Sequence, residues 1–370
     1  MAKLILDVMG GDKAPLTMLE GAIRALPEIT GNLVLLGDQE AITKLVTTKN
    51  RFKNLAQQLR TPANPSGKIE IIHAPENIHM DDSIRALRKK PNATINVGCQ
   101  LASKSFKEAL SGNGNPAVFI SAGHSGAVMA SALMHMGRLP GVERPAIAVK
   151  LPTLSQNNYQ DGCVVLDVGA NVDCKPNHLR DFAIMGAFFA QVERKKPGLP
   201  KVALLSNGEE PGKGNELTRT SAVLIKETSC FGEGQDAVGQ FIGYAEGKEI
   251  FNGQVDVVVT DGFVGNVVLK SLEGLGSSMV NILKSEAKTS LLAPIGFLLA
   301  AGVLKRLKQK LDYAEYGAAP LLGVAGYVFV CHGRSNPKAI KNALIRAQTA
   351  AESRIIEKLA NALNKMKDRK

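Results

Sequence analysis

Eight short apolar runs rich in valine, isoleucine and leucine recur along the chain, and they constrain its fold more than any other feature. Runs of this length and composition are typical of strands buried on both faces of a parallel sheet. Most are followed by glycine-bearing turns and then by helical patterns, as at 177–192, 215–227 and 336–350. Repeated strand–helix units of this kind predict an α/β fold with a parallel sheet. The runs occupy residues 4–6, 33–36, 69–72, 117–120, 164–166, 202–205, 255–259 and 327–330.

No sequence feature marks a domain boundary. Neither an internal repeat nor a low-complexity linker separates the two halves, and residues 61–68 have the composition of a surface loop. With 370 residues, of which 45% are hydrophobic, the chain can bury a large core. We therefore predict one continuous α/β body over residues 1–370, a description that also covers two intimately fused lobes.

The sequence carries no sign of export or of a metal site. Residues 1–7 run directly into the first apolar stretch, with no basic segment and no cleavable small-residue site. The five cysteines are scattered, without a Cys-x-x-Cys pair or a histidine at zinc-ligand spacing. We expect a cytoplasmic protein with buried or inert thiols, no disulfide framework and no metal.

The chain is basic, with a formal net charge of +11, which favours anionic partners. Nucleic acid is disfavoured, because tryptophan is absent and no basic stretch is interleaved with stacking aromatic residues. Anionic lipid, an acidic protein and phosphate remain as partner classes.

Five loops follow predicted strands and combine glycine with asparagine, serine, aspartate or lysine. Ligands of parallel sheets bind at the carboxyl ends of the strands, where glycine lets the backbone approach an anion and helix N-termini direct N–H groups toward it. A single loop of this kind is usually a turn or a helix cap. Five at equivalent positions predict a site for a phosphate-like group. The loops occupy residues 7–12, 121–126, 167–176, 206–216 and 261–266.

Several better-known motifs are absent or incomplete. No Gly-x-Gly-x-x-Gly follows a strand, and 208–214 does not match the spacing of an ATP-binding P-loop. Residues 123–127 approach the nucleophile elbow of serine hydrolases, but Ala127 replaces its final glycine. His178 and His332 are acid–base candidates, although a histidine near a helix start is more often a cap or a surface residue.

An apolar segment at 291–304 precedes four basic residues within 305–310. It is shorter than the roughly 20 apolar residues that span a bilayer. Interrupted by Pro294 and Gly296, it suits a helical hairpin lying on an anionic membrane surface. A buried helix or a dimer contact explains the pattern equally well. We expect an amphipathic segment near 277–312 to project from the body. Its candidate membrane contacts are Leu291, Leu292, Phe297, Leu298 and Leu299.

Six motifs spread along the chain together match one known family, and they lie at residues 7–12, 85–90, 137–146, 166–176, 213–217 and 260–267. On these motifs, and over nearly its whole length, the chain resembles the phosphate acyltransferases of bacterial phospholipid synthesis, which make acyl phosphate from acyl-acyl carrier protein and inorganic phosphate. It departs from the usual family pattern at Val8, where alanine is common, and at His124-Ser125, where Asn-Thr is usual.

The resemblance implies a Rossmann-like parallel-sheet body similar to phosphotransacetylase and the isocitrate/isopropylmalate dehydrogenase group, without their metal or nicotinamide cofactor. It also implies a homodimer at the inner face of the cell membrane, acyl carrier protein as the acyl donor, and a downstream membrane-bound acyl phosphate:glycerol-3-phosphate acyltransferase. Arg85, Arg88 and Lys89 would dock the carrier protein, whereas a solvated basic helix face is the interpretation without the resemblance.

Because phosphate is itself the nucleophile, such an enzyme needs no activated serine or cysteine. It has to hold a dianion against a thioester carbonyl and stabilise the resulting oxyanion. In our hypothesis, Lys175, which lies beside Asn171, supplies positive charge to the phosphate or the oxyanion. Asn215 and Asn266 orient the reacting groups. Asp7, Asp12, Asp167 and Asp261 have no assigned chemistry and are candidate helix caps. The main-chain N–H groups completing the cradle would be those of Gly10, Gly11, Gly123 and Gly126.

Two rival functions stay open at this point. The loops are equally compatible with a phosphotransacylase that uses acyl-coenzyme A. A catalytically silent, membrane-associated scaffold that recruits lipid enzymes is the rival of another class.

Overall fold

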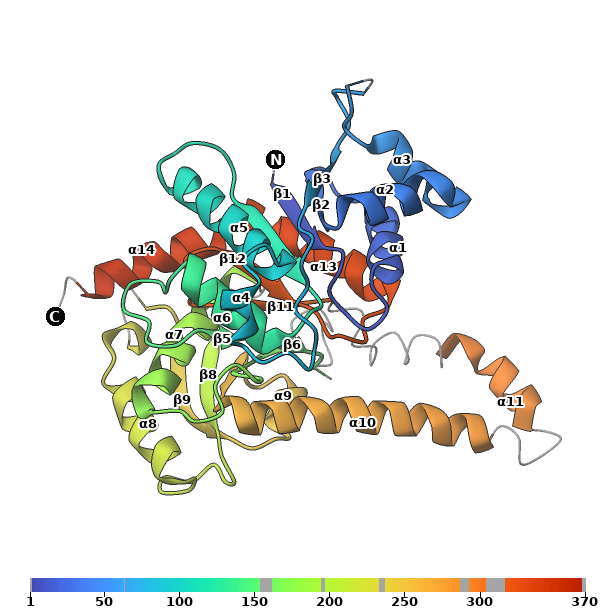
Figure 1. Cartoon of the computed structure of the whole chain (residues 1–370). Coiled ribbons are helices and arrows are strands. Elements are labelled where there is room, and N and C mark those ends of the chain that lie inside the picture. Colours follow the sequence, from blue (N-terminus) through green and yellow to red (C-terminus); the bar gives the residue numbers. More distant parts are fainter. Residues whose placement is uncertain are drawn as a thin grey trace.

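The computed structural model describes residues 2–62, 64–153, 162–193, 197–232, 237–286, 293–303 and 317–367. Strands and helices alternate along these residues and form two sheets with helices on their faces (Figure 1). The predicted α/β architecture is confirmed.

The larger sheet has seven strands in the order β3-β2-β1-β4-β12-β11-β5. Its first five members in that order run parallel, whereas β11 is antiparallel to both of its neighbours. The strands are β1 (Lys3–Asp7), β2 (Asn32–Gly37), β3 (Ile69–His73), β4 (Ala117–Ser121), β5 (Ala146–Ile147), β11 (Ala319–Leu322) and β12 (Tyr327–Val330).

The smaller sheet has five strands in the order β6-β7-β10-β8-β9. All of its pairings are parallel except that of β6 with β7. The strands are β6 (Val149–Leu151), β7 (Cys163–Leu166), β8 (Lys201–Leu205), β9 (Gln240–Ala245) and β10 (Val257–Val259).

Every predicted strand is present, and among the strands of the described residues the sequence pattern missed β5, β6, β9 and β11. Two of these have only two or three residues, β9 contains Gly243, and β11 contains Pro320. All four lie outside the continuous apolar runs that identify a buried parallel strand. The antiparallel strands β5, β6 and β11, and the glycine-containing parallel strand β9, therefore lacked the pattern used for the prediction.

The predicted helices at 177–192, 215–227 and 336–350 are confirmed, with ends shifted by a few residues. Asn215 and Asn336 are N-caps whose side chains accept N–H groups of Thr218 and Ala339. The helices of the larger sheet's lobe are α1 (Leu16–Ala25), α2 (Gln39–Thr48), α3 (Lys53–Gln58), α4 (Ala86–Lys89), α5 (Thr94–Leu110), α6 (Ser125–His135) and α13 (Pro337–Glu352). The others are α7 (Pro176–Glu193), α8 (Glu216–Lys226), α9 (Glu249–Asn252), α10 (Gly262–Glu286), α11 (Ala293–Leu299) and α14 (Ile355–Lys367).

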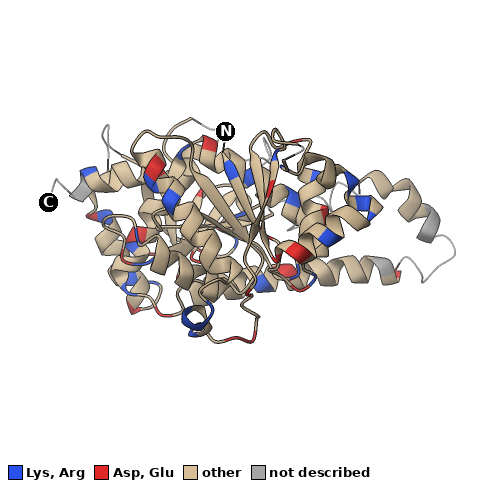
Figure 2. Cartoon of the chain, turned by 45° about the horizontal axis from the view of Figure 1, so that its top comes forward, with Lys and Arg blue, Asp and Glu red and all other residues tan. Residues whose placement is uncertain are grey.

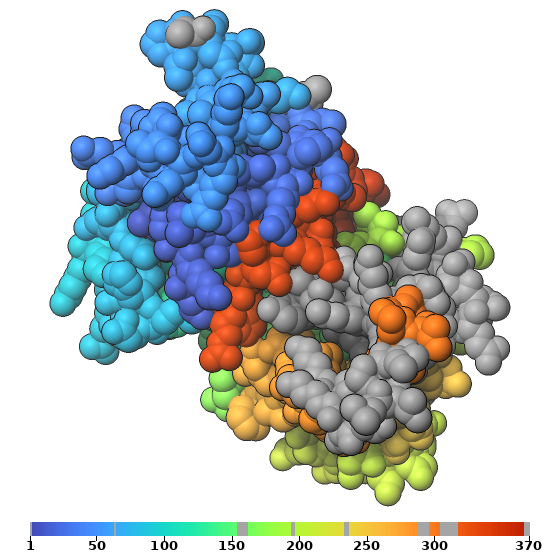
Figure 3. Space-filling model, turned by 90° about the vertical axis from the view of Figure 1, so that its right-hand side faces the viewer, coloured from blue at the N-terminus to red at the C-terminus, as the bar shows by residue number. Residues whose placement is uncertain are grey.

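The two sheets share their hydrophobic core. Alternate residues of β1 point to opposite faces, so that Leu4 and Leu6 join one buried cluster and Ile5 the other. The first cluster continues through Val164 of β7, and the second through Val258 of β10. The C-terminal helices also connect the two lobes, because α13 packs on α1 of the larger sheet's lobe and α14 packs on α7 of the other. Figure 3 shows the two lobes, with red residues near the C-terminus beside the blue residues near the N-terminus.

Helix α10 extends away from both sheets, and α11 lies beyond its outer end (Figure 1). The predicted projecting segment 277–312 overlaps these two helices, and its residues 287–292 and 304–312 lie outside the described residues. Across the described ranges, no helix combines the length and hydropathy needed to cross a bilayer.

Candidate functional site

A cavity of about 1060 Å³ lies where the carboxyl ends of both sheets meet. The larger sheet contributes Gly123 after β4 and Gly333 after β12. The smaller sheet contributes Gly169 after β7 and Asn266 near the start of α10. Loops from two parallel sheets therefore face one space, at the edge where ligands of such sheets bind.

Asp7 holds the loops after β1 and β4 together. Its carboxylate accepts the Met9 N–H (3.1 Å) and the Ser121 hydroxyl (2.7 Å), and the Ser121 oxygen in turn accepts the Gly123 N–H (3.0 Å). Burial raises the pKa of Asp7, and these hydrogen bonds oppose that shift. A side chain at Gly10 would come within 2.8 Å of the Gly123 nitrogen, so the close approach of the two loops requires glycine.

Asp167 organises the corresponding loop of the smaller sheet. Its carboxylate accepts the backbone N–H groups of Gly169 (3.2 Å) and Ala170 (3.0 Å), and both the backbone and side-chain N–H groups of Asn171 (2.6 and 2.9 Å). Burial also raises the pKa of Asp167. Any side chain at Gly265 would collide with the Asp167 carbonyl oxygen, so α10 packs directly on this loop.

Three of these aspartates have structural roles. Asp7 and Asp167 shape glycine loops, and Asp261 caps α10 by accepting the Val264 N–H at 2.9 Å. The backbone N–H of Asp12 donates to the Gly333 carbonyl at 2.9 Å and joins the β1 loop to the cavity wall. The expectation that these aspartates act as caps holds for Asp261, whereas Asp7 and Asp167 each organise a whole loop.

A charged cluster forms part of the cavity wall. Lys270 Nζ lies 2.8 Å from Glu273 Oε2 and 2.7 Å from His332 Nε2. Burial, followed by the charge of Lys270, lowers the pKa of His332 from its ordinary value of 6.5. Lys270 and Glu273 were missed from the sequence. Their spacing could have indicated them, because Lys270 is one helical turn after the predicted site residue Asn266 on the same face of α10.

The cavity side chains do not include an activated nucleophile among the described residues. Burial raises the pKa of the Cys331 thiol to about 12, so this cavity-lining cysteine stays protonated. Ser125 also lines the cavity, but none of the described histidines is hydrogen-bonded to it. The ring of His124 instead caps α6 by accepting the Ala127 N–H at 3.2 Å. The incomplete nucleophile elbow is a helix start.

The structure brings some of the predicted site residues to the cavity and leaves others outside its wall. Gly123 and Asn266 line it, whereas Gly126 lies behind the His124 ring. Gly10 and Gly11 form the layer behind Gly123 and Gly333. Gly11 has a φ of 102°, a conformation that favours glycine.

Asn171, Asn215 and Lys175 have other surroundings. The Asn171 side chain donates to Asp167 and, at 2.7 Å, to the Pro145 carbonyl, so it braces the loop from within. The Asn215 side chain accepts the Thr218 N–H at 2.9 Å as the α8 cap, and the 206–216 loop does not reach the cavity wall. Lys175 is exposed at the start of α7, also outside that wall.

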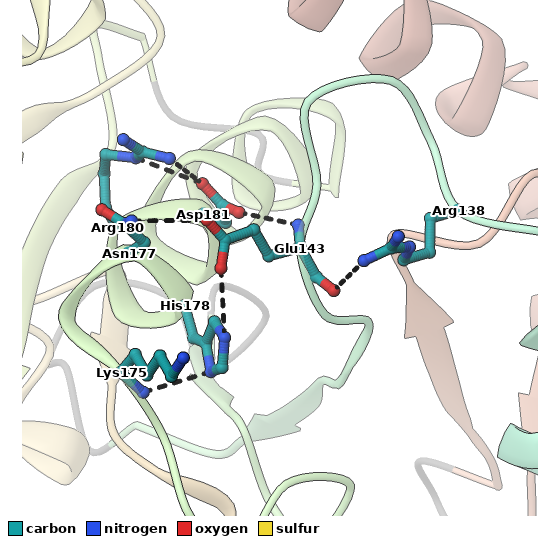
Figure 4. A network of polar contacts seen from close by, with 7 residues as sticks. All are labelled: Arg138, Glu143, Lys175, Asn177, His178, Arg180 and Asp181. Carbon is teal, nitrogen blue, oxygen red and sulfur yellow. Dashed lines mark hydrogen bonds and ion pairs between the residues drawn. The ribbon is translucent and has the colours of Figure 1, made fainter.

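Figure 4 shows the polar network around Lys175. The His178 ring accepts the Lys175 backbone N–H at 3.1 Å, and its other nitrogen lies 3.3 Å from a Glu143 carboxylate oxygen. Asp181 accepts the Glu143 N–H at 3.0 Å and is paired with Arg180. His178 is buried, which lowers its pKa from 6.5. This histidine is a helix cap, and the network fastens the loop before β5 to α7.

Arg85, Arg88 and Lys89 are exposed at the short helix α4, and no ion pair joins them to any other residue in the described ranges. This segment borders the cavity, since Met80 lines it and the Ile84 side chain faces Gly126. Elsewhere, basic and acidic residues are interspersed over both lobes (Figure 2).

Two of the predicted membrane contacts are strongly exposed. Leu298 and Leu299 of α11 expose 75% and 84% of their surface. Phe297 is half-buried and lines the cavity, whereas Leu291 and Leu292 lie outside the described residues.

From Leu272 onward, the cavity continues along α10 between mainly apolar side chains. Leu272, Leu275, Met279 and Leu283 of α10 line this arm, together with Phe297 of α11. The cavity thus has a polar head at the glycine loops and an apolar arm. Within the described ranges, no cluster of three histidine, cysteine, aspartate or glutamate side chains could hold a metal.

Comparisons with known proteins identify relatives of this chain and support its fold. The sequence profile described as "Fatty acid synthesis protein" matches residues 2–358. The phosphate acyltransferase of Pelotomaculum thermopropionicum is 42% identical over 98% of this chain and 95% of its own length. That of Geobacter sp. strain M21 is 43% identical over 98% and 93%. Among solved structures, a phosphotransacetylase from Staphylococcus aureus has a TM-score of 0.51 at 17% identity over 94% of each chain, which supports the Rossmann-like fold.

Proposed function

This chain belongs to the phosphate acyltransferase family, and we propose that it reversibly transfers a fatty acyl group from acyl-acyl carrier protein to inorganic phosphate. A phosphate oxygen attacks the thioester carbonyl carbon, the C–S bond breaks, and the carrier thiol leaves with a proton. The product, acyl phosphate, would supply the acylation of glycerol 3-phosphate in phospholipid synthesis.

One observation carries this proposal: the cavity joins a polar head, which contains Lys270, to an apolar arm. Gly123, Gly169 and Gly333 leave room for a small anion beside Lys270. The Gly123 and Gly169 N–H groups donate to Ser121 and Asp167, so the predicted N–H cradle does not include that of Gly123. An acyl phosphate has the same two parts, a charged group and a hydrocarbon chain. Neither part alone would need both ends of this cavity.

Lys270 and Asn266 are the side chains best placed to act on the reacting groups. Lys270 contributes positive charge to phosphate and to the oxyanion that develops on the thioester carbonyl. Asn266 offers a neutral amide one helical turn away. The protonated state of Cys331 fits direct attack by phosphate, since an acyl-enzyme would need a thiolate there. The catalytic roles of Lys175 and Asn215 stay predictions, because both residues lie outside the cavity wall.

The exposed cations at α4 support acyl carrier protein as the donor. Arg85, Arg88 and Lys89 present unpaired charge among the described residues, beside the cavity edge at Met80. An acidic carrier docked there would be close enough to insert its acyl arm. Electrostatic complementarity of this kind raises association rates and selects partners.

The projecting helices support delivery of the product to a membrane. The exposed Leu298 and Leu299 would contact the inner face of the cell membrane, where a membrane-bound acyltransferase would take acyl phosphate. Phe263, Val267 and Ile282 are exposed along α10, and we propose that a second copy of the chain covers them in a homodimer. Sedimentation equilibrium would test this, and a monomer at micromolar concentration would reject the dimer.

The function is tested by offering palmitoyl-carrier protein and palmitoyl-coenzyme A separately, each with phosphate, and trapping acyl phosphate with hydroxylamine. We expect product from the carrier thioester at the higher kcat/KM. A higher kcat/KM with palmitoyl-coenzyme A would make coenzyme A, and not the carrier protein, the carrier of the acyl donor. If neither thioester yields acyl phosphate, the result would favour a non-catalytic scaffold.

A further inference from the structure

We propose that the apolar arm along α10 is the binding site for the acyl chain, and that Gly276 sets the length of chain it accepts. This inference rests on the proposed function for the identity of the reacting group. The geometry of α10 supplies the site and its direction.

A single face of α10 changes from polar to apolar along its length. Asn266, Lys270 and Glu273 line the cavity near the glycine loops, and Val280 and Leu283 line it farther out. These positions recur every three or four residues, so they share one helix face. The polarity gradient orients a ligand with its charged end at Lys270 and its hydrocarbon end toward Leu283.

The dimensions of the arm fit a long chain. From Asn266 to Leu283 the helix rises about 25 Å at ~1.5 Å per residue. The total volume of about 1060 Å³ is far more than a phosphate ion needs. Phe297 of α11 lines the same cavity, so both projecting helices contribute side chains to the outer part of the arm. Leu275, Met279 and Leu283 are exposed there, so the outer arm is an open apolar groove that an acyl chain would cover.

Gly276 lies in the middle of this face. It lines the cavity and is half-buried, yet a side-chain carbon added to it would meet no atom within 4 Å. A larger residue there would project into open space that the chain is inferred to use. Absence of a side chain at this position keeps the arm continuous.

The same helix provides a matched control. Gly274 is exposed, does not line the cavity, and would also meet nothing within 4 Å if it carried a side chain. Neither glycine has a positive φ, and leucine is a better helix former than glycine, so both leucine variants should fold. Gly276→Leu and Gly274→Leu thus differ in which surface receives the new side chain.

The first experiment measures kcat/KM for carrier thioesters with chains from hexanoyl to palmitoyl, each with phosphate. Each methylene that loses its place in the arm costs about fourfold. We expect Gly276→Leu to lower the palmitoyl value about tenfold or more while the hexanoyl value stays unchanged. Gly274→Leu should keep the wild-type ratio of the two. If the ratio of kcat/KM for palmitoyl to kcat/KM for hexanoyl were the same in both variants, the inference would be overturned.

A binding measurement separates this inference from the proposed function. The fluorescent fatty acid cis-parinaric acid is titrated into wild type and both variants without phosphate or thioester. We expect about tenfold weaker binding to Gly276→Leu alone, and equal binding to all three proteins would reject the channel. If wild type makes no acyl phosphate from any donor, the proposed function fails, while this titration still decides the site.

Discussion

Lys270 Nζ lies 2.7 Å from His332 Nε2, and this contact joins the two sheets at the head of the cavity. Lys270 is on α10, which follows β10 of the smaller sheet, whereas His332 follows β12 of the larger one. The charged cluster therefore exists only when both lobes are packed together. The shared hydrophobic core maintains that packing.

The first prediction concerns Lys270. Lys270→Gln removes the positive charge from the cavity while keeping a hydrogen-bond donor. We expect kcat for acyl phosphate formation to fall about a hundredfold or more, as when one oxyanion donor is lost. Lys270→Arg should recover part of that loss, because it restores the charge. Steady-state kinetics on proteins with matched thermal midpoints measures both.

Lys175→Ala is the comparison that decides between the two lysines. Because Lys175 is exposed outside the cavity wall, we expect its loss to change kcat less than about threefold. A large loss with Lys175→Ala and a small one with Lys270→Gln would restore the role predicted from sequence.

The second prediction concerns pH. The pKa of His178 in the folded protein is lowered from 6.5, mainly by burial. The unfolded chain therefore binds more protons as the pH falls through 6.5, and the free energy of unfolding falls with it. Protonation also prevents the ring nitrogen from accepting the Lys175 N–H.

His178→Asn keeps a cap acceptor that does not titrate, so its thermal midpoint should fall less than that of wild type between pH 8 and pH 5.5. His178→Ala should be less stable at both pH values, by about 1 kcal/mol at pH 8. If the thermal midpoints of wild type and His178→Asn fell equally between pH 8 and pH 5.5, this histidine would not be the cause of the acid sensitivity.

The third prediction concerns the carrier protein. Arg88→Glu combined with Lys89→Glu should raise KM for acyl-carrier protein about tenfold and leave KM for acyl-coenzyme A nearly unchanged. A matched control is Lys104→Glu with Lys107→Glu on α5, which changes the net charge equally. Helix α5 ends where the chain turns back to start β4, at the edge opposite the cavity. Equal effects of the two double variants would indicate a general charge effect and no docking site.

The fourth prediction concerns the exposed leucines of α11. Leu298→Glu puts a charge where an apolar side chain is 75% exposed, and it should abolish flotation with vesicles that contain phosphatidylglycerol. Leu110→Glu alters an exposed leucine at the end of α5 and should float like wild type. Equal flotation of all three proteins would contradict membrane contact by α11.

Continuous apolar runs made the parallel strands other than β9 predictable, because a strand buried on both faces leaves a pattern that local sequence shows. Helix starts at Asn215 and Asn336 were equally visible, since capping is local chemistry. The short antiparallel strands depend on neighbours distant in sequence, as when β11 pairs with β5.

The site was less predictable than the fold. The glycine loops were recognisable, yet sequence could not show that 206–216 would remain outside the cavity wall. Lys270 has no motif around it, and its position follows from α10 packing on the Asp167 loop at Gly265. Asp7 and Asp167 accept local N–H groups from their own loops, but they also accept donors that tertiary folding brings to them, from Ser121 and Ile147.

Incorporation of radiolabelled orthophosphate tests the central claim most directly. Purified protein is incubated with palmitoyl-carrier protein and labelled phosphate, and extractable acyl phosphate is measured beside the thiol released. The account predicts one labelled acyl phosphate for each thiol, with both rates reduced together in Lys270→Gln. Thiol release without label in the acyl product, or no thiol release from carrier protein or coenzyme A donors, would contradict it.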